Sequence, residues 1–447
     1  MSVGTLDPEK RGWRGDSSRP SLPEIHGTLS IPKSPAFFGK MLAFAGPGFL
    51  IAVGYMDPGN WATDLAAGSR YHYQLLSVIM ISNLMAILLQ ALAVKLGVAS
   101  GRDLAQACRD HFSRPVSIGL WIFAEIAIAA CDLAEVIGSA IALNLLFHIP
   151  LIWGVCLTAL DVLLILFLQQ RGFRFIEALV ISLIAVVSVC FALEIAFSHP
   201  ALAGLVHAFF VPSPQMLRDP SMLYIAISIL GATVMPHNLY LHSAIVQTRN
   251  FAQTSEGKRE AIRYGILDST VALTIALFVN AAILVVAASV FFTRGYHEVA
   301  EIQDAYKLLS PLLGVTAAST IFALALLASG QNSTLTGTLA GQVVMEGFLQ
   351  IRLRPWLRRL ITRGLAIVPA IIVTAYWGER GTASLLVFSQ VILSMQLSFA
   401  VFPLVMFTSD RGKMGEFINS AWLKWLGWIT GIVILVLNVW LILQFVK

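Results

Sequence analysis

An apolar stretch near the start of the chain is interrupted by the sequence GYMDPGN at residues 54–60. The interruption puts a carboxylate, a proline and a glycine in the middle of a segment, from about 41 to 68, that otherwise has the composition of a membrane span. Proline removes a backbone donor and clashes with the preceding turn, so a helix breaks here and leaves carbonyl groups without intrahelical partners. In a bilayer such carbonyls are tolerated only where protein or a cavity satisfies them. The stretch therefore predicts a broken helix beside an internal polar site.

A second interruption of the same kind, GATVMPHN at residues 231–238, lies inside the apolar stretch from about 221 to 248. The two interrupted segments are the first of spans one to five and the first of spans six to ten. Because five is an odd number, the second group of five is inserted upside down. Paired broken helices in inverted repeats point to a substrate site near the bilayer midplane of a secondary transporter.

The composition of the 447 residues supports a membrane protein, since 57% are apolar and only 12% charged, against roughly 25% charged in soluble domains. Each crossing of the bilayer needs about 20 mostly apolar residues. The apolar runs predict eleven spans, at about 41–68, 75–97, 115–146, 150–170, 174–197, 221–248, 264–292, 312–348, 356–377, 382–407 and 420–446. The expected fold class is an all-α polytopic membrane protein with eleven transmembrane helices.

The basic residues give the expected orientation. With the N-terminus in the cytoplasm, 24 of the 30 Lys and Arg residues fall on the inner side, as the positive-inside rule requires. The sequence thus predicts a multi-pass protein of the plasma (inner) membrane with its C-terminus outside. The same distribution explains the net charge of +5 without nucleic acid as a partner.

Four segments follow from this map. The predicted segments are a disordered cytoplasmic tail at 1–39, a first repeat at 40–200 broken at 57–60, a second repeat at 201–410 broken at 232–236, and an eleventh helix at 411–447 outside the repeats. The tail is rich in proline and has no apolar run, which excludes a cleavable secretory signal. The four cysteines lie far apart and indicate neither a zinc site nor a disulfide framework.

The two interruptions offer ligands for a metal ion. Asp57 is the central residue, because placing an ionisable group in the bilayer interior costs free energy and usually indicates a functional site. Its carboxylate could also cap the half-helix that follows. Asn60 either offers an amide oxygen or caps a turn. Ala232 offers a backbone carbonyl freed by the break. Met235 offers a thioether sulfur, or else only packs in the core. A mixture of oxygen and sulfur ligands favours Mn²⁺, Fe²⁺, Co²⁺ and Cd²⁺ over Mg²⁺ and Ca²⁺.

Titratable residues near the site could carry protons. Asp132 and Glu135 are three residues apart in one span and so lie on one helix face, where they form either a proton route or a structural ion-pair network. His237 is the only histidine at the depth of the site, and it either relays a proton or orients the broken helix. Asp57 itself could accept a proton when the metal is absent.

The motifs DPGN at 57–60 and MPHN at 235–238 resemble the signature of the Nramp (natural resistance-associated macrophage protein) divalent-metal transporters. The stretch ASGQNSTLTGT at 328–338 is similar to a polar motif in the eighth span of that family, and the resemblance extends from about 41 to 410. It implies a LeuT-like fold of two inverted five-helix repeats plus one extra helix, and proton-coupled uptake of Mn²⁺ or Fe²⁺. It also implies metal ligands at Asp57, Asn60, Met235 and the carbonyl of Ala232.

The resemblance adds further residues to the site. It implies that Gln390 in span ten approaches the metal when the site closes, with Gln396 as an alternative, unless the glutamine only holds neighbouring helices together. The carbonyl of Gly54 is a further expected ligand.

The resemblance also extends the proton route. It implies that Asp132 and Glu135 form an exit path with an arginine near span nine, for which Arg363 is preferred and Arg359 is the alternative. The expected partners are the metal ion, protons and the lipid bilayer, and no resident cofactor is expected because the metal is the transported substrate.

Three other functions compete with this prediction. A sodium-coupled small-solute carrier of the same fold would have a first break rich in glycine and small residues, without the acidic Asp57. An intramembrane metalloenzyme would need spacing such as H-E-x-x-H, whereas His237 and His242 are five residues apart. A channel does not need two broken helices at one depth. We therefore expect a transporter and not an enzyme.

Overall fold

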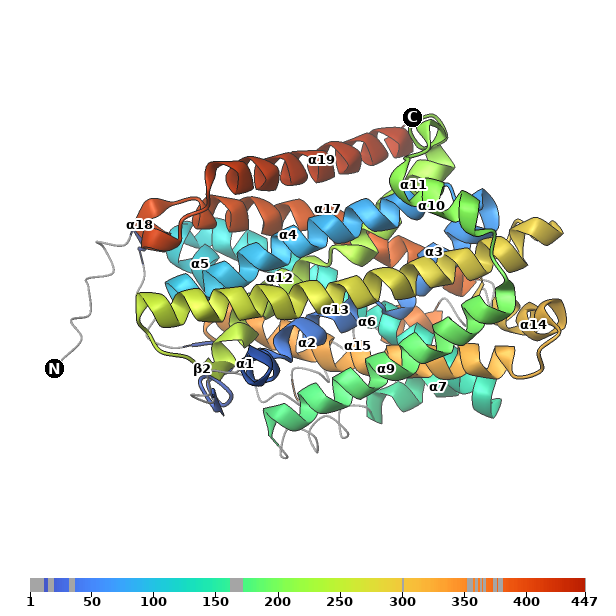
Figure 1. The fold of residues 1–447 in the computed structure, drawn as a ribbon, viewed down its shortest axis with the longest axis horizontal. Helices are drawn as coiled ribbons and strands as arrows, with labels where there is room; N and C mark the ends of the chain where they lie inside the picture. The colour runs from blue at the N-terminus through green and yellow to red at the C-terminus, as the bar shows by residue number, and fades with distance from the viewer. Residues whose placement is uncertain are drawn as a thin grey trace.

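The computed structural model describes residues 12–14, 20–31, 37–160, 172–299, 301–351, 357, 361, 364, 367–372, 376 and 381–446. Long helices run side by side along the longest axis of the molecule (Figure 1). The first part of the chain contains α1 (Phe37–Phe44), α2 (Pro47–Gly54), α3 (Pro58–Tyr71), α4 (Leu76–Ser100), α5 (Leu104–His111), α6 (Arg114–Phe147), α7 (Leu151–Leu157), η2 (Thr158–Leu160) and α9 (Phe173–Ser198).

The second part continues the helical bundle. It contains α10 (Leu202–Phe210), η3 (Pro214–Leu217), α11 (Pro220–Thr233), α12 (Pro236–Ile245), η4 (Val246–Thr248), α13 (Ser255–Val290), η5 (Phe292–Arg294), α14 (Ile302–Leu313), α15 (Ala318–Leu349), α17 (Thr382–Thr408), α18 (Arg411–Met414), η7 (Gly415–Phe417) and α19 (Ala421–Val446). Two short strands, β1 (Leu29–Ser30) and β2 (Arg249–Asn250), pair in parallel.

A helix is interrupted at each of the two sequence motifs, although the non-helical residues differ from the expected 57–60 and 232–236 because the prolines begin the second half-helices. The first lies between α2 and α3, where residues 55–57 are not helical, and the second lies between α11 and α12 at residues 234–235. Pro58 and Pro236 each occupy the first position of the second half-helix, where a missing backbone N–H leaves no hydrogen bond unmade. Asp57 caps α3 by accepting a hydrogen bond from the backbone nitrogen of Asn60.

The all-α membrane class is confirmed, whereas the number of eleven spans is not. Among the described residues, seven helices or helix runs are long and apolar enough to cross a membrane, and the bent pair α1 and α2 adds an eighth. The expected span at 312–348 is helical as α15, but the polar stretch at 328–338 makes it less apolar than the others. The expected spans at 150–170 and 356–377 fall partly outside the described residues.

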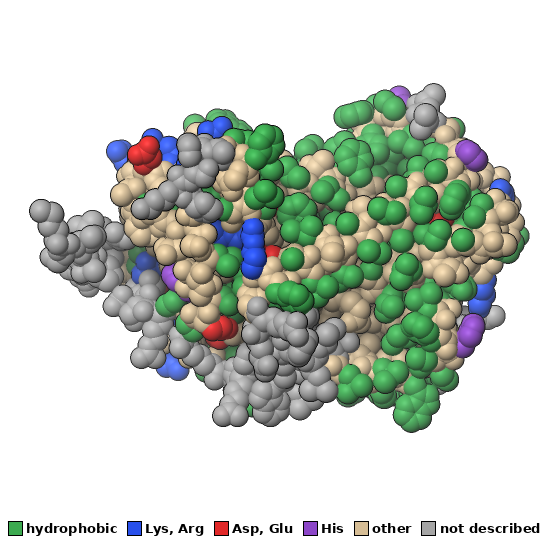
Figure 2. Space-filling model, turned by 60° about the horizontal axis from the view of Figure 1, so that its bottom comes forward, with side chains coloured by type: hydrophobic (Ala, Val, Ile, Leu, Met, Phe, Trp, Pro, Cys, Tyr) green, Lys and Arg blue, Asp and Glu red, His purple; other side chains and the backbone are tan. Residues whose placement is uncertain are grey.

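The surface agrees with a protein that lies in lipid. Figure 2 shows hydrophobic side chains over much of the broad side, whereas charged side chains gather mostly toward the two ends. The helix α19 is a clear example, because large apolar residues such as Trp425, Ile429 and Val436 are more than half exposed.

Small residues bring the helices close together at the first break. Gly138 of α6 packs directly on Pro58, where an added Cβ would overlap the proline ring. Next to the break, the indole of Trp61 packs edge-on against Phe191 of α9 and Phe322 of α15, with ring centroids 4.8 and 5.1 Å apart. The half-helix α3 is therefore held between α6, α9 and α15.

The molecule has two different ends. The β1–β2 end contains β1, β2, α1, α5 and α18, and the α14 end contains α14, α10 and η3 (Figure 1). Part of the predicted tail at 1–39 packs on the β1–β2 end: Trp13 is buried beneath Arg102 and Lys413, and the backbone nitrogen of Leu22 donates to Glu346 at 3.0 Å.

Candidate metal-binding site

The two helix breaks meet at the side chain of Asn60. Its Nδ2 lies 2.8 Å from Oδ1 of Asp57, 3.1 Å from the carbonyl oxygen of Ala232 and 3.4 Å from the carbonyl oxygen of Gly54. Four of the residues predicted as ligands are thus brought together, and they come from both breaks.

The arrangement of these oxygens suits a cation. One donor nitrogen is surrounded by three oxygens, which are the ligand type that divalent ions such as Mn²⁺ prefer. Turning the Asn60 amide by 180° would add its own Oδ1 to the set. Asp57 is fully buried, and its Oδ2 has no hydrogen-bond partner among the described residues. A buried carboxylate with an unused oxygen is costly unless a cation or a proton compensates it.

Met235 brings its sulfur to the first break. It is the last residue before α12 and is fully buried, beside Ala130, Cys131 and Leu393. Its sulfur is so close to Gly54 that an added Cβ there would lie 3.1 Å from Sδ. The thioether therefore lies near the residues that surround the Asn60 amide, as the sequence predicted.

Gln390 of α17 lies against the start of α3. An added Cβ at Gly59 would overlap the side-chain amide of Gln390, so the glycine makes room for it. Its Nε2 donates to Ser389 at 3.0 Å, and its Oε1 has no partner among the described residues. Gln396 lies six residues further along, about 9 Å along the helix axis. The geometry favours Gln390 over Gln396 as the residue of α17 next to the site.

Side chains from three helices satisfy the carbonyl groups freed at the first break. Asn280 of α13 donates to Tyr55 O at 2.7 Å, and both Trp61 Nε1, at 3.2 Å, and Ser329 Oγ of α15 donate to Met56 O. Sequence reasoning did not single out Asn280, although an asparagine inside an apolar span was a usable signal. Ser329 belongs to the polar stretch at 328–338, which helps explain why that stretch is polar.

Cys131 of α6 lies between two of the predicted proton groups, His237 at the second break and Glu135. Sγ of Cys131 is 3.8 Å from Nε2 of His237 and 3.7 Å from Oε1 of Glu135. Asp132 and Glu135 share a face of α6, as predicted, and both approach Gly337 of α15. All four side chains are buried.

Both arginines considered for the end of this route, Arg363 and Arg359, lie outside the described residues.

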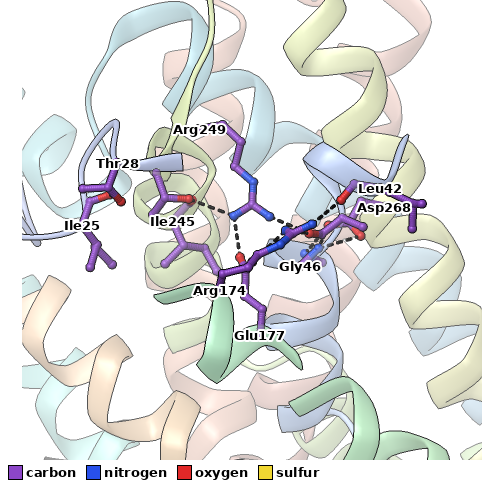
Figure 3. A network of polar contacts seen from close by, with 12 residues as sticks. Ile25, Thr28, Leu42, Gly46, Arg174, Glu177, Ile245, Arg249 and Asp268 are labelled. Carbon is purple, nitrogen blue, oxygen red and sulfur yellow. Dashed lines mark hydrogen bonds and ion pairs between the residues drawn. The ribbon is translucent and has the colours of Figure 1, made fainter. Parts of the chain in front are cut away.

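A buried ion pair lies at the β1–β2 end (Figure 3). Arg249 donates to Glu177 at 2.5 Å, and both side chains are only 1% exposed. Arg174, which is half exposed, donates to the other oxygen of Glu177 at 2.9 Å. Both arginines also donate to the carbonyl of Ala45, at 2.6 Å, in the linker between α1 and α2.

The same linker is held from the other side by α13 (Figure 3). Asp268 accepts hydrogen bonds from the backbone nitrogen of Gly46, at 3.2 Å, and from that of Gly48, at 2.7 Å. Gly46 has a φ of 138°, a conformation that favours glycine. The half-helix that leads to the first break is therefore fixed at its start.

A further polar chain lies between the site and this end. Gln90 of α4 donates to the hydroxyl of Tyr55 at 2.8 Å, and its Oε1 is 2.9 Å from Nδ1 of His242. These contacts join the first break to α12 through α4. His242 thus takes part in a hydrogen-bonded chain, and the described residues contain no group of three or more His, Cys, Asp or Glu side chains that could hold a metal.

A cavity lies at the α14 end. Its volume is about 890 Å³, and it is lined by residues of α3, α11, α14, α17 and α19, with Arg70, Glu298, Glu301 and Asp304 as its charged side chains. Val387 also lines it and lies three residues before Gln390, which is about 4.5 Å along a helix. The cavity therefore ends about one turn from the site.

Comparison with known proteins identifies relatives over nearly the whole chain. Residues 48–444 match the family model described as natural resistance-associated macrophage protein-like. A protein of Nostoc sp., named a divalent metal cation transporter MntH, is 66% identical over 96% of both chains. A protein of the same name from Listeria monocytogenes is 64% identical and covers 99% of this chain and 98% of its own.

Solved structures agree with these relatives. The manganese transporter of Eremococcus coleocola, in complex with an aromatic bis-isothiourea compound, matches with a TM-score of 0.87 and 42% identity over 94% of this chain and 90% of that one. Mhp1, a nucleobase-cation-symport-1 family transporter, matches with a TM-score of 0.59 at 14% identity over 94% of each chain, which is evidence for the fold alone. The expected LeuT-like fold is confirmed.

Proposed function

Because this chain belongs to the natural resistance-associated macrophage protein-like (Nramp) family and carries divalent metal cations across a membrane, we propose that it imports Mn²⁺ or Fe²⁺ together with protons, by alternating access. It is a transporter and not an enzyme. Co²⁺ and Cd²⁺ are further substrates of the same site, and the metal is cargo rather than a resident cofactor.

The observation that supports this site most is the convergence of oxygens from both breaks on one point. Oδ1 of Asp57 and the carbonyl oxygens of Gly54 and Ala232 all lie within 3.4 Å of the Asn60 amide nitrogen. In the metal-bound state Asn60 turns its oxygen inward, Met235 supplies the sulfur, and Gln390 approaches past Gly59. The dehydrated ion then takes the position of the Asn60 amide nitrogen, which in this structure donates hydrogen bonds to these oxygens.

The test of the central ligand is Asp57→Ala in purified protein in proteoliposomes. We expect Mn²⁺ uptake to fall to the level of empty vesicles, because the site loses its only charged ligand. The matched control is Glu256→Gln, which removes an exposed carboxylate in the first turn of α13 and should leave uptake unchanged. Near-normal uptake by the Asp57 variant would show that Asp57 is not an essential metal ligand.

Met235 sets the preference among ions. A thioether favours softer ions, so Met235→Ala should weaken Cd²⁺ transport more than Mn²⁺ transport and let Ca²⁺ or Mg²⁺ compete better. The measurement is uptake of one ion in the presence of increasing amounts of another. An unchanged competition profile would mean that the sulfur only packs against Ala130 and Leu393.

Protons take a route that starts at His237 and continues through Asp132 and Glu135 of α6, with Arg363 at its end. The contacts of Cys131 with His237 and Glu135 support the first part of this route. Metal uptake should then acidify the vesicle lumen, and Asp132→Asn or Glu135→Gln should change that flux. Metal uptake without a pH change in the unmodified protein would make it a uniporter.

We infer that the protein lies in the plasma (inner) membrane with its N-terminus in the cytoplasm and its C-terminus outside. The β1–β2 end then faces the cytoplasm, and the cavity at the α14 end faces outward. The distribution of Lys and Arg along the chain supports this orientation. Labelling of a single cysteine introduced at each end, with a reagent that does not cross membranes, tests it in whole cells.

A further inference from the structure

The last helix is joined to the site-bearing part of the molecule by a pair of polar side chains. Asn438 of α19, which is 4% exposed, donates through Nδ2 to the carbonyl oxygen of Ser394 at 2.7 Å. Its Oδ1 accepts a hydrogen bond from Oγ of the same serine at 2.8 Å. Since an unpaired amide among apolar side chains costs free energy, this double contact fixes α19 to one turn of α17.

That turn is the one that carries Gln390. Ser394 follows Gln390 by four residues, so the two lie on the same side of α17. The turn also packs against Gly231 of α11, where an added Cβ would overlap the carbonyl oxygen of Gln390 and lie 2.8 Å from Cβ of Ser394. Gly231 directly precedes Ala232, whose carbonyl is a proposed ligand. The turn at 390–394 is therefore held between α11 and α19.

Apolar contacts around the pair support the same arrangement. Leu441, one turn after Asn438, belongs to a buried cluster with Val391 of α17 and Ile227 of α11. The helix α19 thus touches both helices that bring residues to the site from the second repeat, and it runs along α17 at the edge of the molecule (Figure 1). Its outer face carries exposed apolar residues, which suit lipid.

We propose that Asn438 is a positioning residue for metal binding, because it holds Ser394 and thereby keeps the turn at 390–394 against Gly231, where Gln390 faces the ion. This inference rests on the proposed function, since it requires Gln390 to be a ligand. It assigns a role in metal affinity to a helix that lies outside the two repeats. Loss of the hydrogen bonds between Asn438 and Ser394 lets the turn move away from Gly231 and weakens metal binding, while the maximal transport rate is little changed.

The test uses Asn438→Leu, which is similar in size and cannot form the two hydrogen bonds. In proteoliposomes the KM for Mn²⁺ should rise about 3- to 10-fold, while the maximal rate per transporter stays within about twofold. Ser394→Ala keeps the carbonyl but removes Oγ, so it should raise KM in the same direction by a smaller factor. Thr430→Val changes another buried polar residue of α19, two turns away, and should leave KM unchanged.

A second measurement separates positioning from a general structural role. In a Gln390→Ala background, Asn438→Leu should cause no further rise in KM, because the residue on which it acts is gone. An equal rise in both backgrounds, or a change in the maximal rate alone, overturns the proposal. If Gln390→Ala raises KM but Asn438→Leu does not, the positioning role of Asn438 is wrong and Gln390 remains a ligand. An unchanged KM in Gln390→Ala overturns the positioning role together with the assignment of Gln390 as a ligand.

Discussion

The β1–β2 end and the α14 end of this transporter differ in what fills them. At the β1–β2 end, charged and polar side chains are buried and paired with one another, as Glu177 is with Arg249 and Asp268 with the linker before α2. At the α14 end, charged side chains line a cavity of about 890 Å³. On the α14 side, the cavity reaches Val387, three residues before Gln390 in α17.

This difference indicates which contacts control alternating access. The polar contacts at the β1–β2 end join elements of both repeats, since Glu177 belongs to α9 and Arg249 and Asp268 follow the second break. If the half-helix α2 moves to open this end, the hydrogen bonds of Arg174 and Arg249 to Ala45 and those of Gly46 and Gly48 to Asp268 must break. At the α14 end, Glu301 accepts hydrogen bonds from the hydroxyl of Thr382 and from the backbone nitrogen of Ala383, beside the cavity. We expect the balance between the two states to depend mainly on the buried charged contacts of the β1–β2 end.

The largest effect is expected from Arg249→Ala. Removing one partner of a buried ion pair costs at most about 3–5 kcal/mol, and less where, as here, Arg174 still contacts the carboxylate; we expect this cost only in the state with a closed β1–β2 end. The molecule should shift to the opposite state, so a cysteine placed at Val387 in the cavity becomes much less accessible to a thiol reagent that does not cross membranes. The background carries Cys156→Ser, because that native cysteine is exposed.

The matched control for this variant is Arg174→Ala. Arg174 contacts the same carboxylate but is half exposed, and exposed ion pairs contribute only about 0–1 kcal/mol. Equal labelling of Val387→Cys in the Arg249 variant and in the parent would show that the buried pair does not control the two states.

An intermediate effect is expected from Asp268→Asn. The carboxylate accepts charge-assisted hydrogen bonds from two backbone nitrogens of the α2 linker, and an amide oxygen accepts them about half as strongly. Labelling of Val387→Cys should fall, but by less than with Arg249→Ala. Asp304→Asn makes the same chemical change in the cavity at the other end and should not alter labelling. If the two aspartate variants behave alike, the contrast between the ends is wrong.

The breaks themselves could be predicted from sequence, because their causes are local. Pro58 and Pro236 stand next to other polar or helix-breaking residues, Asp57 and Gly59 in one case and His237 and Asn238 in the other, whereas Pro403, among apolar residues, lies inside the continuous helix α17. The repeat symmetry then brought the second break to the first, and the structure places Asn60 next to Ala232, 172 residues away. The metal and proton roles of these residues stay predictions until transport is measured.

The contacts that close the β1–β2 end could not be predicted in the same way. Glu177 and Arg249 are 72 residues apart, and nothing in their neighbouring sequence marks them as a pair. Asn280 and Ser329 support the first break from helices whose packing the hydropathy pattern does not specify. The count of eleven spans stays a prediction, because the expected spans at 150–170 and 356–377 lie partly outside the described residues.

The smallest effect is expected from Gln90→Leu, which removes the hydrogen bonds to Tyr55 and His242. Each such bond between membrane helices contributes about 0.6 kcal/mol, so the two together should change the balance between the states by less than about tenfold. Labelling of Val387→Cys should fall slightly and metal affinity should be unchanged, because Gln90 does not touch the proposed ligands. Asn83→Leu, on the same helix, removes a buried amide whose Nδ2 has no partner among the described residues and serves as the control. If labelling falls as much as in Arg249→Ala, the hydrogen bonds of Gln90 to Tyr55 and His242 would stabilise the closed end as strongly as the ion pair does.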